Sequence, residues 1–183
     1  MSENRVSASP VSAESPRTAH PIGEGALEAV MQARALLSDV TPLKSDCGKF
    51  CANACCHGDE ETGMLLFPGE ESLYSGCPFG RVIPAHFALA GRQALLFVCD
   101  GHCERAMRPL ACRLFPLFAR IGRDGNASVA LDSRARGTCP LCRYGLEALD
   151  SAFVAAASRA YDLLMQDADC SAYLRALSEA CTL

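Results

Sequence analysis

The stretch C-G-K-F-C-A-N-A-C-C-H, residues 47–57, places four cysteines within ten positions. Further thiols follow in C-D-G-H-C at 99–103, in R-P-L-A-C-R-L-F-P at 108–116 and in C-P-L-C at 139–142. Closely spaced thiols can converge on one centre without ordering much chain, and thiolates select zinc, copper(I) or iron–sulfur clusters over hard cations. The spacing therefore predicts thiolate ligation of metal.

The composition indicates one domain with a real hydrophobic core. The chain has 183 residues, 50% of them hydrophobic, with 12 cysteines and a formal net charge of -4. No signal peptide or membrane span is recognisable, so we expect the reducing cytoplasm, where free thiols are metal ligands more often than disulfide partners. The acidic balance predicts no binding to nucleic acid or to a membrane, and leaves a protein partner open.

Two parts of the chain are expected. Residues 1–22 are rich in Ser, Pro and Ala, which predicts a disordered tail. Residues 23–183 form a single cysteine-cluster domain that begins with an amphipathic helix from Gly25 to about Val40, after which Pro42 marks a stop.

The rest of the domain mixes strands and helices. Residues 94–98 are apolar and predict a buried strand leading into Cys99, and the Asp-Gly dipeptide between residues 117–121 and 127–131 predicts a hairpin. Beyond Cys139 an apolar stripe at helical spacing predicts C-terminal helices. The expected fold class is α+β, with a small irregular sheet and cysteine-rich loops that hold metal, packed by N-terminal and C-terminal helices.

The first cysteine segment allows two geometries. Cys47, Cys51 and Cys55 would share one face of a helix, but Gly48 and Asn53 weaken that helix, so a looped knuckle is an equal alternative. The third thiol falls one residue late for the C-x3-C-x2-C loop of radical adenosylmethionine enzymes, which disfavours that class.

Adjacent residues rarely both ligate one ion, because the backbone must strain to allow it. One member of the Cys55–Cys56 pair is therefore expected to serve a second centre or to lie just outside the first.

The segment around Cys112 predicts a rigid turn. Pro109 can start a short helix and Pro116 can end it, and Arg108 and Arg113 flank the thiol. Guanidinium charge stabilises thiolate and offsets the charge of about −2 that four thiolates give a dipositive centre. The alternative is that the arginines pair with surface acids.

The remaining candidates carry weaker signals. Cys139 and Cys142 form a C-x2-C pair that also allows a thioredoxin-like redox role, since a helix follows. Cys77 is a lone thiol that fits a ligand or a core residue equally.

Two further cysteines and two histidines rank below the clustered thiols. Cys170 and Cys181 fall in the C-terminal helices and are expected to be structural. His57 and His102 lie beside cysteines and could ligate, but exposed histidines next to loops are more often simply solvated.

The knuckle, the C-D-G-H-C turn and the R-P-x-x-C-R-x-F-P element together resemble the YkgJ-type cysteine-cluster family, which is sometimes labelled CxxCxxCC and comprises proposed zinc- or iron-chelating proteins. The first knuckle has x3 spacing rather than x2, and the C-D-G-H-C turn is compressed. The resemblance implies metal ligation by Cys51, Cys55, Cys56, Cys99, Cys103, Cys112 and Cys47.

The flagellin lysine N-methylase family looks like a more distant relative. It has a similar C-C knuckle and a C-P dipeptide before a helix, which Cys139 and Pro140 match. This resemblance implies that Cys139 is a ligand. It does not imply methylation, because Gly23-Glu24-Gly25 follows no strand and no other glycine loop for adenosylmethionine is recognisable.

The first hypothesis is a metal-binding protein that holds an iron–sulfur cluster or iron, with zinc next, for electron transfer or in support of a partner enzyme. A cluster-dependent protein-modifying enzyme related to the lysine methylases is the second, and a structural zinc module that presents a surface to a protein partner is the third. Two centres, or one centre in a sulfur-rich surrounding, are both open. The candidate ligands are Cys47, Cys51, Cys55, Cys56, Cys99, Cys103, Cys112, Cys139 and Cys142.

Overall fold

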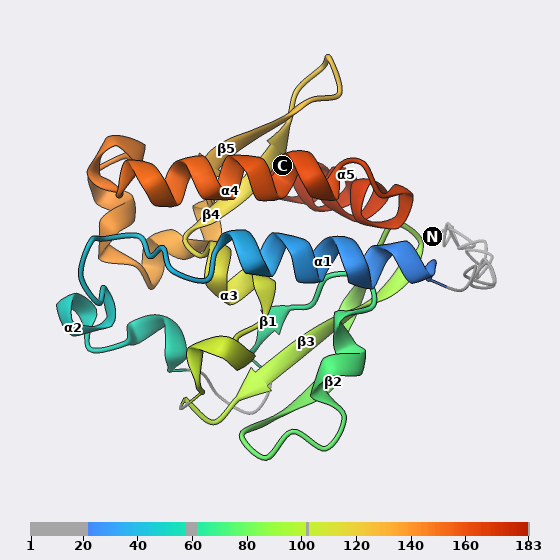
Figure 1. Cartoon of the computed structure of the whole chain (residues 1–183), viewed down its shortest axis with the longest axis horizontal. Helices are drawn as coiled ribbons and strands as arrows, with labels where there is room; N and C mark the ends of the chain where they lie inside the picture. Colours follow the sequence, from blue (N-terminus) through green and yellow to red (C-terminus); the bar gives the residue numbers. More distant parts are fainter. Residues whose placement is uncertain (1–21, 58–61, 102, 183) are drawn as a thin grey trace, which may run out of the picture.

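The computed structural model describes residues 22–57, 62–101 and 103–182 of the chain. The predicted tail therefore lies outside the described residues except for Ile22, and so does His102. The fold is α+β, as predicted. Three long helices, α1 (Glu24–Leu36), α4 (Ser151–Leu164) and α5 (Ala168–Thr182), lie together on one side of the molecule, and a small sheet lies on the other (Figure 1).

Helix α1 forms because small and apolar residues recur on one face. Ala26, Ala29, Val30 and Ala33 are buried against the other helices. The helix ends at Leu36, short of the predicted Val40.

The early end of α1 has a physical reason in the backbone carbonyls that follow it. The guanidinium of Arg105 caps the chain after α1. It donates to the carbonyl oxygens of Leu37, at 3.0 Å, and Ser38, at 2.8 Å, and also to that of Val40. These oxygens would otherwise point along a continuing helix axis.

The larger sheet is antiparallel, in the order β1 (Met64–Leu65), β3 (Arg92–Cys99) and β2 (Gly80–Leu89). Strand β3 is the predicted buried strand and ends on Cys99. The sequence analysis did not predict β2, which contains Pro84 and has an irregular register between Pro84 and Ala88. A proline and a bulge both weaken the alternation that marks a strand.

The predicted hairpin has the expected bounds. Strands β4 (Leu117–Ile121) and β5 (Ala127–Leu131) pair in register, with Ala119 opposite Val129. Gly125 has a φ of 81° in the turn, which only glycine adopts without strain. The short helices are α2 (Gly48–Cys51), η1 (Ala54–Cys56), η2 (Glu70–Tyr74), η3 (Arg105–Met107), α3 (Leu110–Leu114), η4 (Ser133–Gly137), η5 (Pro140–Arg143) and η6 (Leu146–Ala148).

Two hydrophobic clusters hold these elements together. The larger joins the three long helices, α3 and the hairpin, and it contains the fully buried Cys170 with Cys181 packed at its edge. The smaller centres on Leu66, Tyr74 and Phe97, and Cys77 packs against it. In the described ranges no helix has both the length and the apolar character needed to cross a bilayer.

Candidate metal centre

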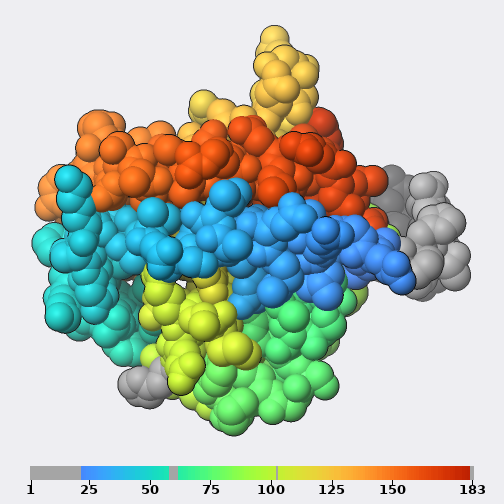
Figure 2. Space-filling model, viewed as in Figure 1, coloured from blue at the N-terminus to red at the C-terminus, as the bar shows by residue number. Residues whose placement is uncertain are grey.

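The nine predicted ligands come from four separate stretches of chain that meet at one end of the molecule. In Figure 1 this is the end where α2 and the short helices after β5 lie, opposite the start of α1. Figure 2 shows the segment that follows α1, coloured teal, at the same end. The thiols sit beside or within α2, η1, α3 and η5 and at the end of β3.

The first cysteine segment is a looped knuckle rather than one helix. Helix α2 stops at Cys51 because Ala52 and Asn53 adopt left-handed conformations, with φ of 51° and 56°. The chain then re-enters a helical turn at η1, which carries Cys55 and Cys56. Of the two geometries that the sequence allowed, the structure has the loop.

A first cavity lies inside this knuckle, and we call it the knuckle cavity. Its volume is ≈ 80 Å³. In addition to the cysteines, the loop that follows α1 and the Thr138–Leu141 segment form its walls. Its thiols are those of Cys47, Cys51, Cys55, Cys56, Cys112 and Cys139.

A second cavity lies between the knuckle and the end of β3, and we call it the strand cavity. Its volume is ≈ 170 Å³, and His57 is part of its wall. The two cavities share six residues, three of them cysteines, so they are neighbours. The thiols of the strand cavity are those of Cys55, Cys56, Cys99, Cys103 and Cys112.

The thiols of the strand cavity act on one another electrostatically. Burial raises the pKa of Cys112, and the nearby thiols of Cys103 and Cys56 raise it further. Burial also raises the pKa of Cys99, again with contributions from Cys103 and Cys56. A negative charge on any one of these sulfurs disfavours a negative charge on another. The four thiols of Cys56, Cys99, Cys103 and Cys112 therefore form one electrostatic group.

The knuckle thiols form a second group. Burial raises the pKa of Cys47, and Cys51 and Cys139 add to this effect. Burial together with Cys139 raises the pKa of Cys142 to about 11. Cys142 is the one predicted ligand that lines neither cavity, and it is tied to the group through its hydrogen bond with Cys139.

Cys55 connects the two groups. Its hydrogen bond with Cys56 is the largest cause that raises its pKa, and burial and the thiols of Cys47 and Cys51 raise it further. Both members of the adjacent pair line both cavities.

The donor set fits a soft metal, although the thiols stand apart. Within the described part of the chain, no three His, Cys, Asp or Glu side chains are placed so that they could hold one ion as they stand. The thiols that line the two cavities are nevertheless of the type that zinc, iron and iron–sulfur clusters take as ligands. Metal sites of this kind generally complete their geometry when the ion binds.

Arg108 supplies positive charge to both cavities, as predicted. Burial opposes its charge, but its hydrogen bond to Cys103 and the nearby thiols of Cys56 and Cys112 outweigh burial and raise the pKa of Arg108. The guanidinium lines both cavities. Its Nε is buried and has no hydrogen-bond partner among the described residues, so this donor can serve an anionic group in the cavities.

Arg113 lines the knuckle cavity together with Cys112, but its hydrogen bonds go to backbone carbonyls. Its Nε donates to the Arg108 carbonyl at 3.1 Å, and its Nη1 donates to the Arg34 carbonyl at 3.2 Å. Its Nη2 donates to the carbonyls of Arg105, at 2.9 Å, and Ala106, at 2.8 Å. The guanidinium thus pairs neither with the Cys112 thiol nor with a surface acid, and it fixes the chain that leads into α3.

A buried ion pair that nothing in the sequence indicated positions Cys112. Glu70 has no exposed surface, and its Oε1 accepts from Arg34 Nη1 at 3.2 Å and from the Leu110 backbone N–H at 2.7 Å. Its Oε2 accepts from the Phe67 N–H at 3.2 Å. Burial raises the pKa of Glu70, whereas these three donors lower it; because both oxygens accept, the geometry is that of a carboxylate. The first residue of α3 is thereby tied to α1.

The C-x2-C pair lacks the context of a thioredoxin-like motif. That motif expects a strand directly before its first cysteine, whereas η4 separates β5 from Cys139. A 3-10 turn, η5, then carries Cys142.

Comparison of the chain with protein-family models, with curated proteins and with solved structures found no match.

Proposed function

We propose that this chain is a metal-binding protein that uses clustered thiolates to hold an iron–sulfur cluster or iron, with zinc next in preference. One observation carries the proposal: eight of the nine predicted ligands line two neighbouring cavities, although they come from stretches of chain far apart in sequence. Unrelated buried thiols would lie at separate places in the hydrophobic core, where Cys170 lies.

Two centres account for the arrangement. The strand cavity would use Cys56, Cys99, Cys103 and Cys112, and the knuckle cavity would use Cys47, Cys51, Cys55 and Cys139, with Cys142 beside it. Four thiolates around a dipositive centre leave a charge of about −2, which Arg108 offsets from between the cavities.

The volume of the strand cavity favours a polynuclear centre there. A single ion is touched by all of its ligands and needs almost no cavity, whereas a cluster with bridging sulfides needs space. The ≈ 170 Å³ of the strand cavity is more than twice the ≈ 80 Å³ of the knuckle cavity. An iron–sulfur cluster, when bound, would supply one-electron transfer.

The motif resemblance to the YkgJ-type family supports metal binding independently of the cavities. It rests on the knuckle, the C-D-G-H-C turn and the Arg108–Pro116 element, and no family model matches the chain.

The test is anaerobic purification followed by absorption spectroscopy and by measurement of iron, acid-labile sulfide and zinc per chain. We expect a brown protein that absorbs near about 400 nm, with iron and sulfide in equal amounts. A colourless protein with stoichiometric zinc would replace the cluster by zinc. A folded protein that is free of metal, and takes up none when iron or zinc is supplied, contradicts the proposal.

Variants test the assignment to two centres. Cys99→Ser is expected to remove metal from the strand cavity alone, and Cys139→Ser from the knuckle cavity alone, so each lowers the metal content without abolishing it. Cys170→Ser is the matched control outside both cavities. Complete loss of metal in either cavity variant would favour one centre over two.

A further inference from the structure

A third cavity lies next to the strand cavity, and we call it the aromatic chamber. Its volume is ≈ 270 Å³. Its walls come from β1, α3, β4, α4 and α5 and from the segments between them, which supply Phe67 and Phe115. The aromatic side chains that line it are those of Phe67, Phe115, Phe118, Tyr161 and Tyr173.

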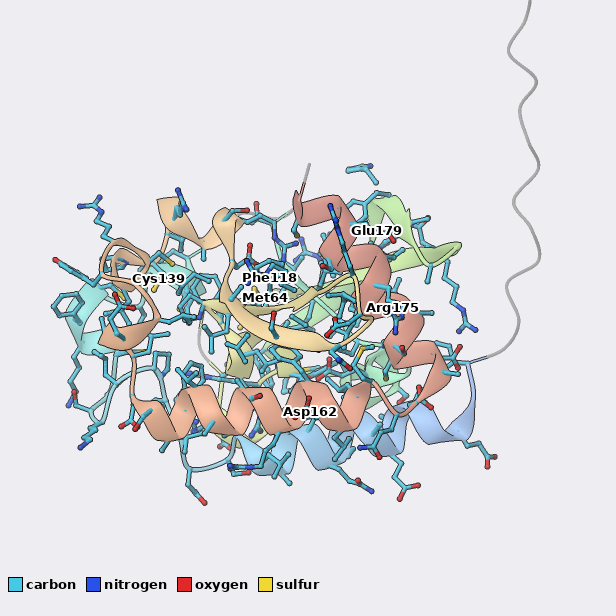
Figure 3. The ribbon with its side chains drawn as sticks, turned by 90° about the horizontal axis from the view of Figure 1, so that it is seen from above. Met64, Phe118, Cys139, Asp162, Arg175 and Glu179 are labelled. Carbon is cyan, nitrogen blue, oxygen red and sulfur yellow. The ribbon has the colours of Figure 1, made fainter. Side chains whose placement is uncertain are left out.

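The chamber and the strand cavity share one wall. Gly63, Met64 and Phe115 line both. Helix α3 stands between the two, since Ala111 and Leu114 line the chamber whereas Cys112 lines the strand cavity. Met64 and Phe118 are labelled near the middle of the molecule in Figure 3. A molecule in the chamber would therefore lie one side chain away from the strand-cavity thiols.

The chamber has a buried donor without a partner. Tyr173 is 6% exposed, and its hydroxyl has no hydrogen-bond partner among the residues that the structure describes. A buried hydroxyl without a partner costs about 1–3 kcal/mol, so such a group usually indicates an unseen partner.

The hydroxyl of Tyr173 lies within electrostatic reach of Arg134, which lines the chamber. Burial raises the pKa of Tyr173, Glu70 raises it further, and Arg134 opposes them. A separate surface groove lies on the outer side of the Tyr173 ring. Arg134 lines the chamber but not this groove. The pKa of Tyr161, raised by burial and by Asp132, also responds to Arg134 and to Tyr173. The two phenols and Arg134 therefore form one group.

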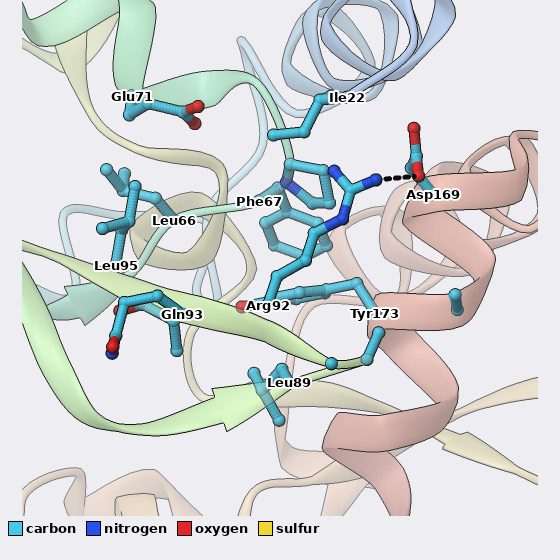
Figure 4. A pocket seen from close by; sticks show the side chains of 15 residues that line it. Ile22, Leu66, Phe67, Glu71, Leu89, Arg92, Gln93, Leu95, Asp169 and Tyr173 are labelled. Atoms are coloured by element: carbon cyan, nitrogen blue, oxygen red, sulfur yellow. Dashed lines mark hydrogen bonds and ion pairs between the residues drawn. The ribbon is translucent and has the colours of Figure 1, made fainter. Parts of the chain in front are cut away.

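The groove on the outer side of the ring is a separate feature. Phe67 and Tyr173, whose ring centroids are 5.1 Å apart, line both the groove and the chamber and so form the wall between them. Figure 4 shows this wall from the groove side, with the Arg92–Asp169 ion pair, 3.0 Å long, beside it.

The polar groups of the chamber are mostly donors. Asp132 forms an ion pair with Arg134, in which Nη2 of Arg134 lies 2.6 Å from Oδ2 of Asp132. Tyr161 and Tyr173 have pKa values raised above the ordinary value, so both keep their protons and can donate at neutral pH. A ligand that suits these walls offers a flat apolar face and an acceptor oxygen.

We propose that the aromatic chamber binds a small aromatic molecule that carries an acceptor oxygen, as an aromatic carboxylate does, with its ring among the phenylalanines and that oxygen accepting the hydrogen bond of Tyr173. The position next to the strand cavity makes this molecule a candidate substrate or effector of the thiolate centre. Binding itself does not depend on what the thiols hold, so its failure would leave the proposed metal function untouched.

The test uses the full-length protein as purified and 4-fluorobenzoate as the probe, followed by ¹⁹F NMR titration, with fluorobenzene as the apolar control. We expect saturable binding of 4-fluorobenzoate and weaker binding of fluorobenzene. Tyr173→Phe should weaken the binding of 4-fluorobenzoate about 3- to 10-fold, the usual effect of one hydrogen bond. Tyr144→Phe, which alters an exposed tyrosine, is the matched control and should leave binding unchanged.

Thermal unfolding supplies a second readout. Without ligand, Tyr173→Phe should melt above the parent protein, because it removes a hydroxyl without a partner. With saturating 4-fluorobenzoate the order should reverse, since only the parent donates to the ligand. Metal content should be the same in both proteins.

Three results would overturn the proposal. The first is binding that Tyr173→Phe does not weaken, and the second is equal binding of fluorobenzene. The third is a lower melting temperature for Tyr173→Phe in the absence of ligand, which would mean that a water molecule alone satisfies the hydroxyl.

Discussion

The two thiol-lined cavities differ in what holds their cysteines in place. Cys99 ends a strand that pairs on both sides, and Cys112 lies in α3, whose entry is fixed by Arg113 and by Glu70. The knuckle thiols lie on turns whose hydrogen bonds are local: Gly48 N–H donates to Asp46 Oδ1 at 3.0 Å, and Asn53 N–H donates to the Gly48 carbonyl at 2.9 Å.

This difference separates a half that is positioned by long-range contacts from a half that is held by local turns. Long-range buried contacts place a side chain in the absence of metal, whereas local turns of a few residues are easily opened. We therefore expect Cys99 and Cys112 to keep their positions in the metal-free protein, and the knuckle, which supplies Cys55 and Cys56 to both cavities, to depend on metal.

The largest expected effect comes from the buried ion pair behind α3. Arg34→Met leaves the Glu70 carboxylate buried without its charged partner, which typically costs about 3–5 kcal/mol. We expect the free energy of unfolding, measured by urea titration, to fall by this amount, with loss of metal from the strand cavity.

The matched control is Arg92→Met. Its ion pair with Asp169 has side chains that are 23% and 27% exposed, and pairs of this kind contribute about 1 kcal/mol or less. Equal destabilisation by the two substitutions would show that the Arg34–Glu70 pair does not anchor α3.

Much of the scaffold is predictable because its signals are local. The hairpin follows from Asp124-Gly125 between two apolar runs, and α3 has the bounds that Pro109 and Pro116 impose. The gathering of the cysteines was also predictable, since the spacing of ligands repeats within short segments.

The residues that anchor the site were not predictable in the same way. Arg113 donates to four backbone carbonyls, and a carbonyl leaves no trace in the sequence because every residue has one. Arg34 and Glu70 are 36 residues apart, and each looks like an ordinary exposed charge on a helix until the fold buries both. The alternative that Arg113 pairs with a surface acid rested on the average behaviour of surface arginines and on no signal in this sequence.

Metal removal should have the next largest effect, and it should fall on one side of the comparison. In hydrogen exchange of the metal-free protein, we expect the amides of residues 47–56 to lose protection and those of α3 and β3 to keep it. Adding metal back should restore the knuckle. Equal loss of protection in α3 would mean that metal, rather than the arginines, orders both halves.

A smaller effect is expected from alkaline pH. Burial raises the pKa of Cys112 and Cys142 in the folded protein, that of Cys142 from an ordinary value near 9 to about 11. A thiol whose pKa is raised by folding contributes stability that is complete below its unfolded pKa and is lost as the pH rises through its folded pKa. The metal-free protein should therefore lose stability between about pH 9 and 11, as measured by urea titration at each pH.

The metal-bound protein provides the comparison for this pH dependence. Its thiols are already deprotonated as ligands, so its stability should change much less over the same range. Parallel loss of stability in both forms would indicate that the buried thiols are not the groups that titrate.

The smallest effect is expected from the cysteines outside both cavities. Cys170 is fully buried in the large core, with its Sγ 3.8 Å from the Ala26 carbonyl oxygen, so Cys170→Ala should cost about 1 kcal/mol through the small space that it leaves. Cys181, at the edge of that core, should cost less when changed to alanine. Neither substitution should alter the metal content, because neither thiol lies at the end of the molecule where the two cavities meet. Loss of metal from the Cys170→Ala protein, measured with its unfolding free energy still within about 1 kcal/mol of the parent value, would mean that ligands are drawn from the helical core as well, and the contrast between the two cavities would then no longer describe the whole site.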